Sequence, residues 1–584
     1  MTNATAASAT ARPSFVPRLV RRAQRLAETQ TVLFTIVLVA VVLLVLLPVI
    51  SLIAYSFVES LPNQPLRIGF DAWRHAVESP LIMGSLLNSV LLLLAIHGIS
   101  LPVAVVIAWV LARTDLPFRN GFEFMFWVSF FMPTLSILMG WILCLDPEYG
   151  LLNKLVELLP FVDKGPFNIF SFWGIVWGHL ASHSITVKVM LLTPTFRNID
   201  SSFEEASEIC GANRFTTLLR IMVPAVTPAI LAITLIAMIR AMQSFEIEMV
   251  LGTPIRLYVY STLVYALTGQ EPPDFGAASA LATIGLACLL PLIFAQRWLG
   301  LRRQYVSVSG RMKSAPIRLG RWKLPVLLAI CLIVLMLTAI PMVFLGLTSA
   351  MKLFGFFQIP EPWTFAHWKT VFADETFRQS FVNTLQMAGG AALVAVVLLS
   401  LVAYFSVSST FKARAALDFL SWLPAAVPGV LFSLGLLYVF LDIPLLRPLY
   451  GSMALMIIAA VVGGMTLGTQ IFKSTMLQLS RELEEASTVA GATWLRTFRS
   501  VVLPIVVPTV LLVGITIFIT AAREIASVAL VASAGTKTLS LLQLDYMIQG
   551  SYGPAAVISF IVIAMSTGLA LVARAVGLRI GLRN

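Results

Sequence analysis

The sequence predicts an all-α polytopic membrane protein with two tandem homologous domains of about six transmembrane helices each, about 12 in total. Three observations predict this fold: few charges, long apolar runs and an internal repeat. Of 584 residues, 58% are hydrophobic and 12% charged, whereas soluble domains carry about 25% charged residues. Runs such as Thr31–Val58 and Phe381–Phe411 exceed the roughly 18 apolar residues of a spanning helix. Inside lipid, only helices could satisfy the backbone groups of these runs.

The second half of the chain repeats the first. A first set of landmarks recurs after 295 residues: Phe70, Trp73, Asn88 and Ser89 return as Phe365, Trp368, Asn383 and Thr384. The phrase EEAS at 204–207 recurs after 280 residues, at 484–487. The offsets differ because the first half is longer between the two landmarks. Repetition of this length predicts two copies of one domain.

Each copy contains about six apolar stretches. In the first domain we expect helices at about 31–57, 84–112, 122–145, 170–195, 222–245 and 275–297. In the second we expect them at about 324–351, 380–411, 416–441, 450–473, 502–523 and 554–574. The predicted boundaries are a segment 1–30, a first domain 31–300, a basic linker 301–323 and a second domain 324–584.

Positive charge gathers beside the apolar runs. The formal net charge is +12, with Arg18, Arg21 and Arg22 before the first run and the densest cluster between Arg297 and Lys323. Cytoplasmic segments carry such an excess, so we expect cytoplasmic N- and C-termini, linker and EEAS phrases. An even number of crossings makes the two domains parallel repeats. This distribution indicates the lipid bilayer as a partner and argues against nucleic acid.

Two other features limit the interpretation. The first apolar run exceeds the roughly 7–15 residues of a signal-peptide core, so we expect a retained helix. The four cysteines, Cys144, Cys210, Cys288 and Cys331, are scattered without a CxxC pair. Neither a disulfide framework nor a metal site is therefore expected.

The repeated phrase is polar in an otherwise apolar chain. It reads EEASEICGANRFTTLLRIMVP at 204–224 and EEASTVAGATWLRTFRSVVLP at 484–504. Gly211 and Gly491 permit a sharp turn, and Pro224 and Pro504 suit the first turn of the next helix. We expect a short two-helix knuckle that projects into the cytoplasm and transmits force from a partner. An ordinary solvated turn would explain one copy, but not two in register.

This pattern resembles the EAA loop of permease subunits in binding-protein-dependent, type I ABC importers. The residues that carry the resemblance, in loops 201–224 and 481–504, are Glu205, Ala206, Ser207, Gly211, Pro224, Glu485, Ala486, Ser487, Gly491 and Pro504. The departures are mild: serine at the third position of both copies, Val223 for leucine and Val501 for isoleucine. The resemblance implies that these residues couple the chain to two copies of an ABC ATPase subunit. It also implies a periplasmic substrate-binding protein and a bacterial inner membrane.

The chain has no phosphate-binding loop of the GxxxxGK[ST] type. Its nearest string, SAGTKT at 533–538, lacks the first glycine and separates its second glycine from the lysine. We therefore expect no catalytic centre, no metal site and no cofactor in this chain. ATP and Mg would be used by the partner ATPase.

The cargo is suggested by a further resemblance, to fused two-domain iron(III) permeases. The phrases that carry it are Trp141 with YGLLN at 149–153, LGTP at 251–254, PPDFG at 272–276 and YVSVSG at 305–310. Importers of thiamine, polyamines or 2-aminoethylphosphonate in the same class are the alternatives. A secondary transporter would need coupling carboxylates in mid-membrane, and an intramembrane enzyme would need convergent polar groups there; the apolar runs offer few of either.

Ionisable residues near membrane depth are candidates for the translocation path. Arg240 and Glu246 lie late in one predicted helix and Arg523 and Glu524 late in its counterpart, near the periplasmic ends. They would line an outer gate or contact the binding protein; the alternative is an interhelical ion pair that holds the two halves in register. His179 and His183 share a helix face, and we expect packing or hydrogen bonding there rather than a metal site.

Overall fold

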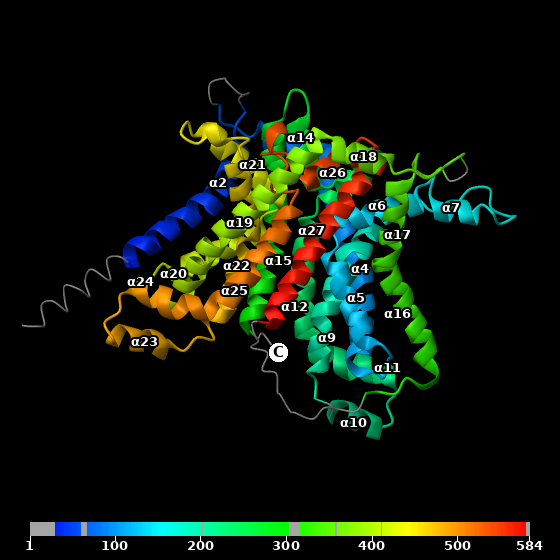
Figure 1. The fold of residues 1–584 in the computed structure, drawn as a ribbon, viewed down its shortest axis with the longest axis horizontal. Helices are drawn as coiled ribbons and strands as arrows, with labels where there is room; N and C mark the ends of the chain where they lie inside the picture. Colours follow the sequence, from blue (N-terminus) through cyan, green and yellow to red (C-terminus); the bar gives the residue numbers. More distant parts are fainter. Residues whose placement is uncertain are drawn as a thin grey trace, which may run out of the picture.

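The computed structural model describes residues 30–59, 67–200, 202–302, 316–356, 359–409 and 411–579. These residues form helices and isolated bridges, with no strand (Figure 1). Among them, ten helices are long and apolar enough to cross a membrane, or twelve if each of two sharply bent pairs is one span. The predicted polytopic fold is therefore confirmed. Nearly all of the predicted segment 1–30 and most of the linker 301–323 lie outside the described residues.

The first domain contains the helices up to α15. Its first span runs over Gln30–Tyr55 and includes η1 (Val42–Leu46) and α2 (Leu47–Tyr55). The others are α3 (Asp71–Glu78), α4 (Pro80–Arg113), α5 (Arg119–Phe131), α6 (Thr134–Leu145), α7 (Leu151–Val156), α8 (Phe172–His179), η2 (Leu180–Ser184), α9 (Ile185–Arg197), α10 (Ser202–Ile209), α11 (Arg214–Thr217), η3 (Leu218–Met222), α12 (Val223–Met242), α13 (Glu246–Leu251), η4 (Thr253–Ile255), α14 (Tyr260–Gly269) and α15 (Phe275–Arg302).

The second domain repeats this order. Its helices are η5 (Gly320–Trp322), α16 (Lys323–Leu337), α17 (Ala339–Ala350), α18 (Ala366–Ala373), α19 (Glu375–Ser408), α20 (Arg414–Trp422), η6 (Leu423–Ala426), α21 (Gly429–Asp442), η7 (Arg447–Leu449), α22 (Met453–Met476), α23 (Arg481–Val489), α24 (Trp494–Thr497), η8 (Phe498–Val502), α25 (Leu503–Ala522), η9 (Ala534–Thr536), α26 (Leu539–Ile548) and α27 (Tyr552–Arg579).

Two predicted straight helices are wrong. The predicted 122–145 is α5 and α6, bent by 99°, and the predicted 416–441 is α20–η6 and α21, bent by 113°. The cause is proline: Pro133 and Pro428 follow the bends, and the preceding Met132 and Val427 are extended. A residue before proline is disfavoured in the α region, and proline itself offers no N–H to continue the helix.

The repeat extends to matching hydrogen bonds. Ser89 Oγ accepts from the backbone N–H of Tyr260 at 3.0 Å, and Thr384 Oγ1 accepts from that of Leu539 at 2.8 Å. These pairs hold the first turns of α14 and α26 against α4 and α19. The internal duplication predicted from the sequence is therefore visible in side-chain contacts.

The unequal offsets also have a structural origin. The bend prolines Pro133 and Pro428 differ by 295 residues, but the N-cap serines Ser171 and Ser452 differ by 281. The extra residues of the first domain form α7 and its flanking loops, which project beside α6 and α17 (Figure 1). The offset then falls by one more residue, from 281 at these serines to 280 at the EEAS phrases. This step coincides with η2, a π-helical turn in the first domain, whose counterpart α22 is a regular helix.

The two domains interlock through their first spans. α2 packs on α21 of the second domain, and α17 packs on α6 of the first, as Figure 1 shows. The contacts are close: a Cβ atom added at Gly140 would lie 2.3 Å from the carbonyl oxygen of Pro341. A Cβ atom added at Gly435 would lie 2.3 Å from that of Pro48. Glycine thus allows each bent pair to approach the backbone of the other domain.

The end of the linker is tied to the first domain. Asp115 N–H donates to Ile317 O at 3.0 Å, and Asp115 Oδ1 accepts from Leu319 N–H at 2.8 Å. The Leu319 bond and the Lys323 ammonium hold the pKa of the Asp115 carboxyl below its usual value. This attachment lies at the C-terminal end of α4, next to Arg113.

Candidate coupling loops and central cavity

The first EEAS phrase folds as two helices with a sharp turn between them. α10 ends where Gly211 N–H donates to Glu208 O at 2.9 Å and Ala212 N–H donates to Ser207 O at 3.1 Å. This is the hydrogen-bond pattern of a Schellman turn. Gly211 has φ +75°, which glycine adopts without the strain of a side chain. The backbone of the predicted knuckle is therefore present.

The second copy folds in the same way. Gly491 has φ +78°. In each knuckle, the serine at the third motif position contacts a threonine ten residues later: Ser207 Oγ lies 2.7 Å from Thr217 Oγ1, and Ser487 Oγ lies 2.9 Å from Thr497 Oγ1. The serine that departs from the family pattern thus joins the two helices of each knuckle.

Each knuckle continues directly into a membrane span. From Phe215 to Met242 and from Trp494 to Ala522, the chain is helical without interruption. Pro224 and Pro504 are the second residues of α12 and α25, directly behind the π-helical turns η3 and η8. The other predicted coupling residues are exposed, namely Glu205, Ala206, Glu485 and Ala486.

Both knuckles expose large apolar side chains at equivalent positions. Ile209 is 87% exposed and its counterpart Val489 is 88% exposed. The other exposed pairs, 280 residues apart, are Phe203 with Leu483 and Phe215 with Leu495. We call these six residues the knuckle tips. Figure 1 shows α10 and α23 at the same end of the molecule, away from α14, α18 and α26.

The first glutamate of each knuckle is half-buried and accepts hydrogen bonds from a different partner. Glu204 accepts from Arg113 Nε at 2.9 Å and from Nη2 at 2.6 Å. Glu484 instead accepts from the hydroxyl of Tyr404 at 3.0 Å, and that hydroxyl accepts from Trp494 Nε1 at 3.0 Å. The first knuckle is thus held by an ion pair and the second by a phenol, among its other contacts.

A cavity of about 190 Å³ lies between the two domains. Three of the four predicted pathway residues line it: Glu246 from the first domain and Arg523 and Glu524 from the second. His183 also lines it, and its Nε2 lies 3.3 Å from the carbonyl oxygen of Phe130. The remaining lining residues are Pro133, Thr134, Leu135, Thr520, Ile525, Ser540 and Gln543.

Arg240 does not line this cavity. It lies in the last turn of α12 and is exposed. The structure therefore places three predicted residues in the cavity wall, and the fourth, Arg240, lies near the cavity-lining His183.

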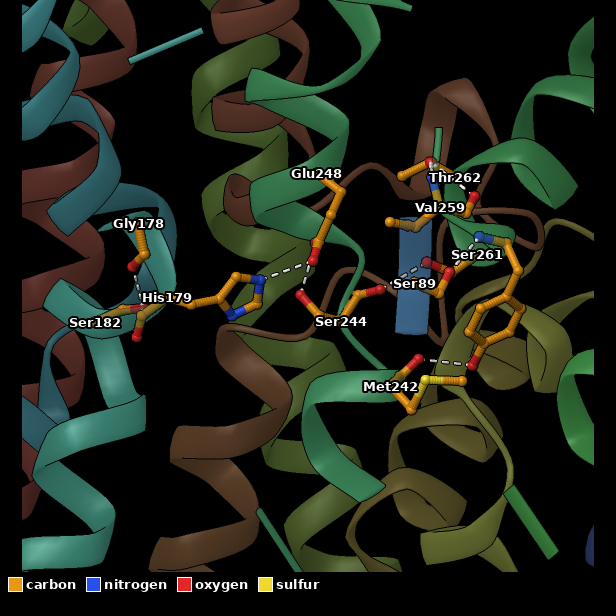
Figure 2. Close-up of polar contacts among 11 residues, drawn as sticks. Ser89, Gly178, His179, Ser182, Met242, Ser244, Glu248, Val259, Ser261 and Thr262 are labelled. Carbon is orange, nitrogen blue, oxygen red and sulfur yellow. Dashed lines mark hydrogen bonds and ion pairs between the residues drawn. The ribbon is translucent and has the colours of Figure 1, made fainter. Parts of the chain in front are cut away.

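A second polar cluster is buried entirely within the first domain (Figure 2). His179 Nε2 lies 2.7 Å from Glu248 Oε1, and Ser244 Oγ donates to Glu248 Oε2 at 2.7 Å. Ser261 Oγ donates in turn to the carbonyl of Ser244 at 2.6 Å. This closed network joins α8, α13 and α14, so the hydrogen-bonding role predicted for His179 is confirmed. Within the described residues, no three His, Cys, Asp or Glu side chains are grouped to hold a metal ion.

Comparison with known families assigns both halves of the chain to one family. Residues 100–305 and 395–581 each match the family described as "Binding-protein-dependent transport system inner membrane component". The chain belongs to this family. One match falls in each half, so the permease domain occurs twice, and the predicted resemblance is confirmed.

Curated relatives of this permease include ferric and polyamine systems. It is 27% identical over 413 residues to the ferric transport system permease protein FbpB of Actinobacillus pleuropneumoniae, covering 69% of this chain and 58% of the relative. It is 26% identical to the probable ABC transporter permease protein y4fN of Sinorhizobium fredii, covering 70% and 74%. It is 25% identical to the spermidine/putrescine permease PotB of Salmonella typhimurium, covering 46% and 93%. The chain thus spans 58% of the length of this FbpB and of the putative ferric permease FbpB 1 of Haemophilus influenzae.

Sequence reasoning missed two parts of this permease's polar interior. Glu248 was not singled out, although it lies two residues after Glu246 and is buried. The cavity-facing position of His183 was also missed, because it depends on the π-helical turn η2. The signal available for the cavity was proline in the middle of a predicted span, since Pro133 lies in the cavity wall.

Proposed function

We propose that this chain is the membrane-spanning permease subunit of an ATP-driven importer, coupled through its two knuckles to separate ATPase subunits. The observation that carries the proposal is the matched pair of knuckles, each with the same turn, the same internal hydrogen bond and exposed apolar tips. Two equivalent docking surfaces suit two copies of one ATPase subunit. That subunit would bind ATP and Mg²⁺, and this chain would bind no cofactor and catalyse no reaction.

The knuckle tips are suited to docking. Ile209 and Val489 lie in charged segments, and burial of apolar surface against a partner is favourable by roughly 25 cal/mol per Å². Glu205 and Glu485 beside them are exposed and available to cationic groups of the partner. The uninterrupted helices that follow would carry the movement of a docked partner into the membrane.

The test replaces the tip residues. Ile209→Glu and Val489→Glu should each assemble poorly with the ATPase subunit and lower ATP-driven uptake at least tenfold in proteoliposomes. Because both side chains are almost fully exposed, folding should be unchanged. Phe161→Glu is the matched control, since Phe161 is 95% exposed and lies outside both knuckles. Normal assembly and uptake by both knuckle variants would contradict the proposal.

The proposed orientation follows from the knuckles. With the ATPase in the cytoplasm of a bacterium, α10 and α23 mark the cytoplasmic face of the inner membrane and α14 and α26 the periplasmic face (Figure 1). Both termini would then be cytoplasmic. A periplasmic binding protein would deliver cargo to the opposite end, where Glu246, Arg523 and Glu524 line the cavity.

We propose iron(III) as the cargo, carried through the central cavity. The support is the likeness to permeases named as ferric and the two cavity carboxylates, whose hard oxygen atoms suit a small trivalent cation. Thiamine, polyamines and 2-aminoethylphosphonate are the alternatives, and one relative is named as a spermidine/putrescine permease. Titration of the cognate binding protein with all four should give tight binding of iron(III) alone; preference for another would replace the cargo but keep the importer.

A further inference from the structure

Two hydrogen bonds cross between the domains from donors at equivalent positions. Gln243 Nε2 donates to Ala425 O at 2.6 Å, and Arg523 Nη1 donates to Phe131 O at 3.3 Å. Gln243 and Arg523 are 280 residues apart, the offset of the knuckles, and each is the C-cap of the span that follows its knuckle. The donors are therefore equivalent, although glutamine is exchanged for arginine, and the acceptors are displaced by one residue relative to the bend prolines.

Both acceptors lie at the bends of the broken spans. Phe131 is the last residue of α5, and Ala425 lies in η6, two residues before Val427 and Pro428. The last carbonyl groups of a helix receive no hydrogen bond from within that helix. Here a side chain from the other domain donates to such a carbonyl at each bend, so each bend is tied to the knuckle-bearing helix of the opposite domain.

Each tie lies at the far end of a continuous helix that begins in the knuckle. The uninterrupted helices have 28 and 29 residues, so about 40 Å of helix separates knuckle from C-cap. The bend of the first domain also lines the cavity, through Pro133, Thr134 and Leu135, together with Arg523 itself. A displacement of the second knuckle would therefore reach a wall of the cavity through one side chain.

We infer that Gln243 and Arg523 are positioning residues for transport, which pass the movement of each knuckle to the bend of the opposite domain. This inference rests on the proposed coupling function. It explains why both bends are cross-linked by side chains and why the two domains must move together. Neither residue needs to contact the ATPase.

The experiment measures ATP hydrolysed per cargo molecule imported, with the complete transporter in proteoliposomes. Gln243→Leu keeps the size of the side chain but removes the donor, and it should raise that ratio at least threefold. Gln243→Arg, which installs the residue of the second domain, should retain a ratio near the native one. Gln470→Leu is the matched control, because the Gln470 amide nitrogen is buried without a hydrogen-bond partner.

The outcomes separate this inference from the proposed function. A native ratio in Gln243→Leu, with Ile209→Glu still inactive, would overturn the inference and leave the coupling role standing. An equal rise in Gln243→Leu and Gln470→Leu would also overturn it, since the effect would then be general. Normal uptake by Ile209→Glu would instead remove the proposed function.

A cross-linking measurement covers the case in which Gln243→Leu fails to fold. Gln243→Cys and Ala425→Cys are combined after the four native cysteines are replaced by alanine, and a short bifunctional thiol reagent is added. The yield should differ at least threefold between the nucleotide-free and the vanadate-trapped transporter. Equal yields in the two states would show a static contact and overturn the inference.

Discussion

The glutamates at 204 and 484 occupy equivalent positions, and each accepts a hydrogen bond from a different type of residue. A guanidinium fork gives Glu204 two charge-assisted hydrogen bonds, whereas the Tyr404 hydroxyl gives Glu484 a neutral donor. Arg113 Nη1 also donates to Ile199 O at 3.1 Å, so Arg113 joins α4 to α10 and to the segment between α9 and α10. The cost of losing an anchor should therefore differ between the two knuckles.

Arg113→Met should destabilise the chain by about 3 kcal/mol, because it leaves a nearly buried carboxylate without its cation. The expected result is a lower denaturation temperature of the purified chain in detergent. Tyr404→Phe, the counterpart in the second knuckle, should cost about 1 kcal/mol, as for one neutral hydrogen bond. Combining Arg113→Met with Glu204→Gln should recover part of the loss. Equal costs at Arg113 and Tyr404 would contradict this account.

At the scale of the element, the sequence predicts which stretches are helical better than how they are bent. Spans such as α4 and α19 follow from apolar composition, because lipid leaves the backbone no other solution. The bends at Pro133 and Pro428 were missed because the runs continue through them without a charged residue. The cavity was missed for the same reason, since one of its walls is a bend. The neighbouring α7 insertion shows only as a difference between the two repeat offsets.

The bent elements also make a prediction at their glycine contacts. Gly140→Ala and Gly435→Ala should each destabilise the chain by about 1–3 kcal/mol, because the new Cβ atom would overlap the backbone of Pro341 or Pro48. Thermal denaturation in detergent measures this. Gly98→Ala in α4 is the control: no atom lies within 4 Å of its Cβ position, and alanine favours helix. Equal denaturation temperatures for all three variants would show that the close contacts of Gly140 and Gly435 do not affect stability.

For the whole molecule, several structural features are shared by both domains, whereas one buried polar network belongs to a single domain. The knuckles, the first spans and the cross-domain hydrogen bonds are duplicated. By contrast, His179 and Glu248 of the first domain correspond to Ala460 and Val528 of the second. The buried network in Figure 2 is therefore a property of one domain. The π-helical turn η2 adds one residue to the first domain, so the two halves can be aligned correctly here only when this turn is known.

The duplication of the knuckle in both domains predicts that the two knuckles move together. Cys210 is exposed at the tip of the first knuckle, and its counterpart Ala490 is exposed at the second. Spin labels at Cys210 and Ala490→Cys, with Cys144, Cys288 and Cys331 replaced by alanine, report the distance between knuckles. In the assembled transporter, that distance should shorten on vanadate trapping by more than the breadth of the nucleotide-free distribution. The reason is that closure of two docked ATPase subunits would draw their docking sites together, while the interlocked first spans keep the domains joined.

A label pair inside one domain separates this movement from a local rearrangement. Asn120 is exposed near the start of α5, in the same domain as Cys210. The distance from Cys210 to Asn120→Cys should stay constant between the two states, because the first domain would rotate as a unit about the contacts of Gly140 and Gly435. A change within the domain and none between the knuckles would show that each knuckle bends on its own span. Such bending would occur at the π-helical turn of each span, η3 or η8, or at its internal proline, Pro228 or Pro508.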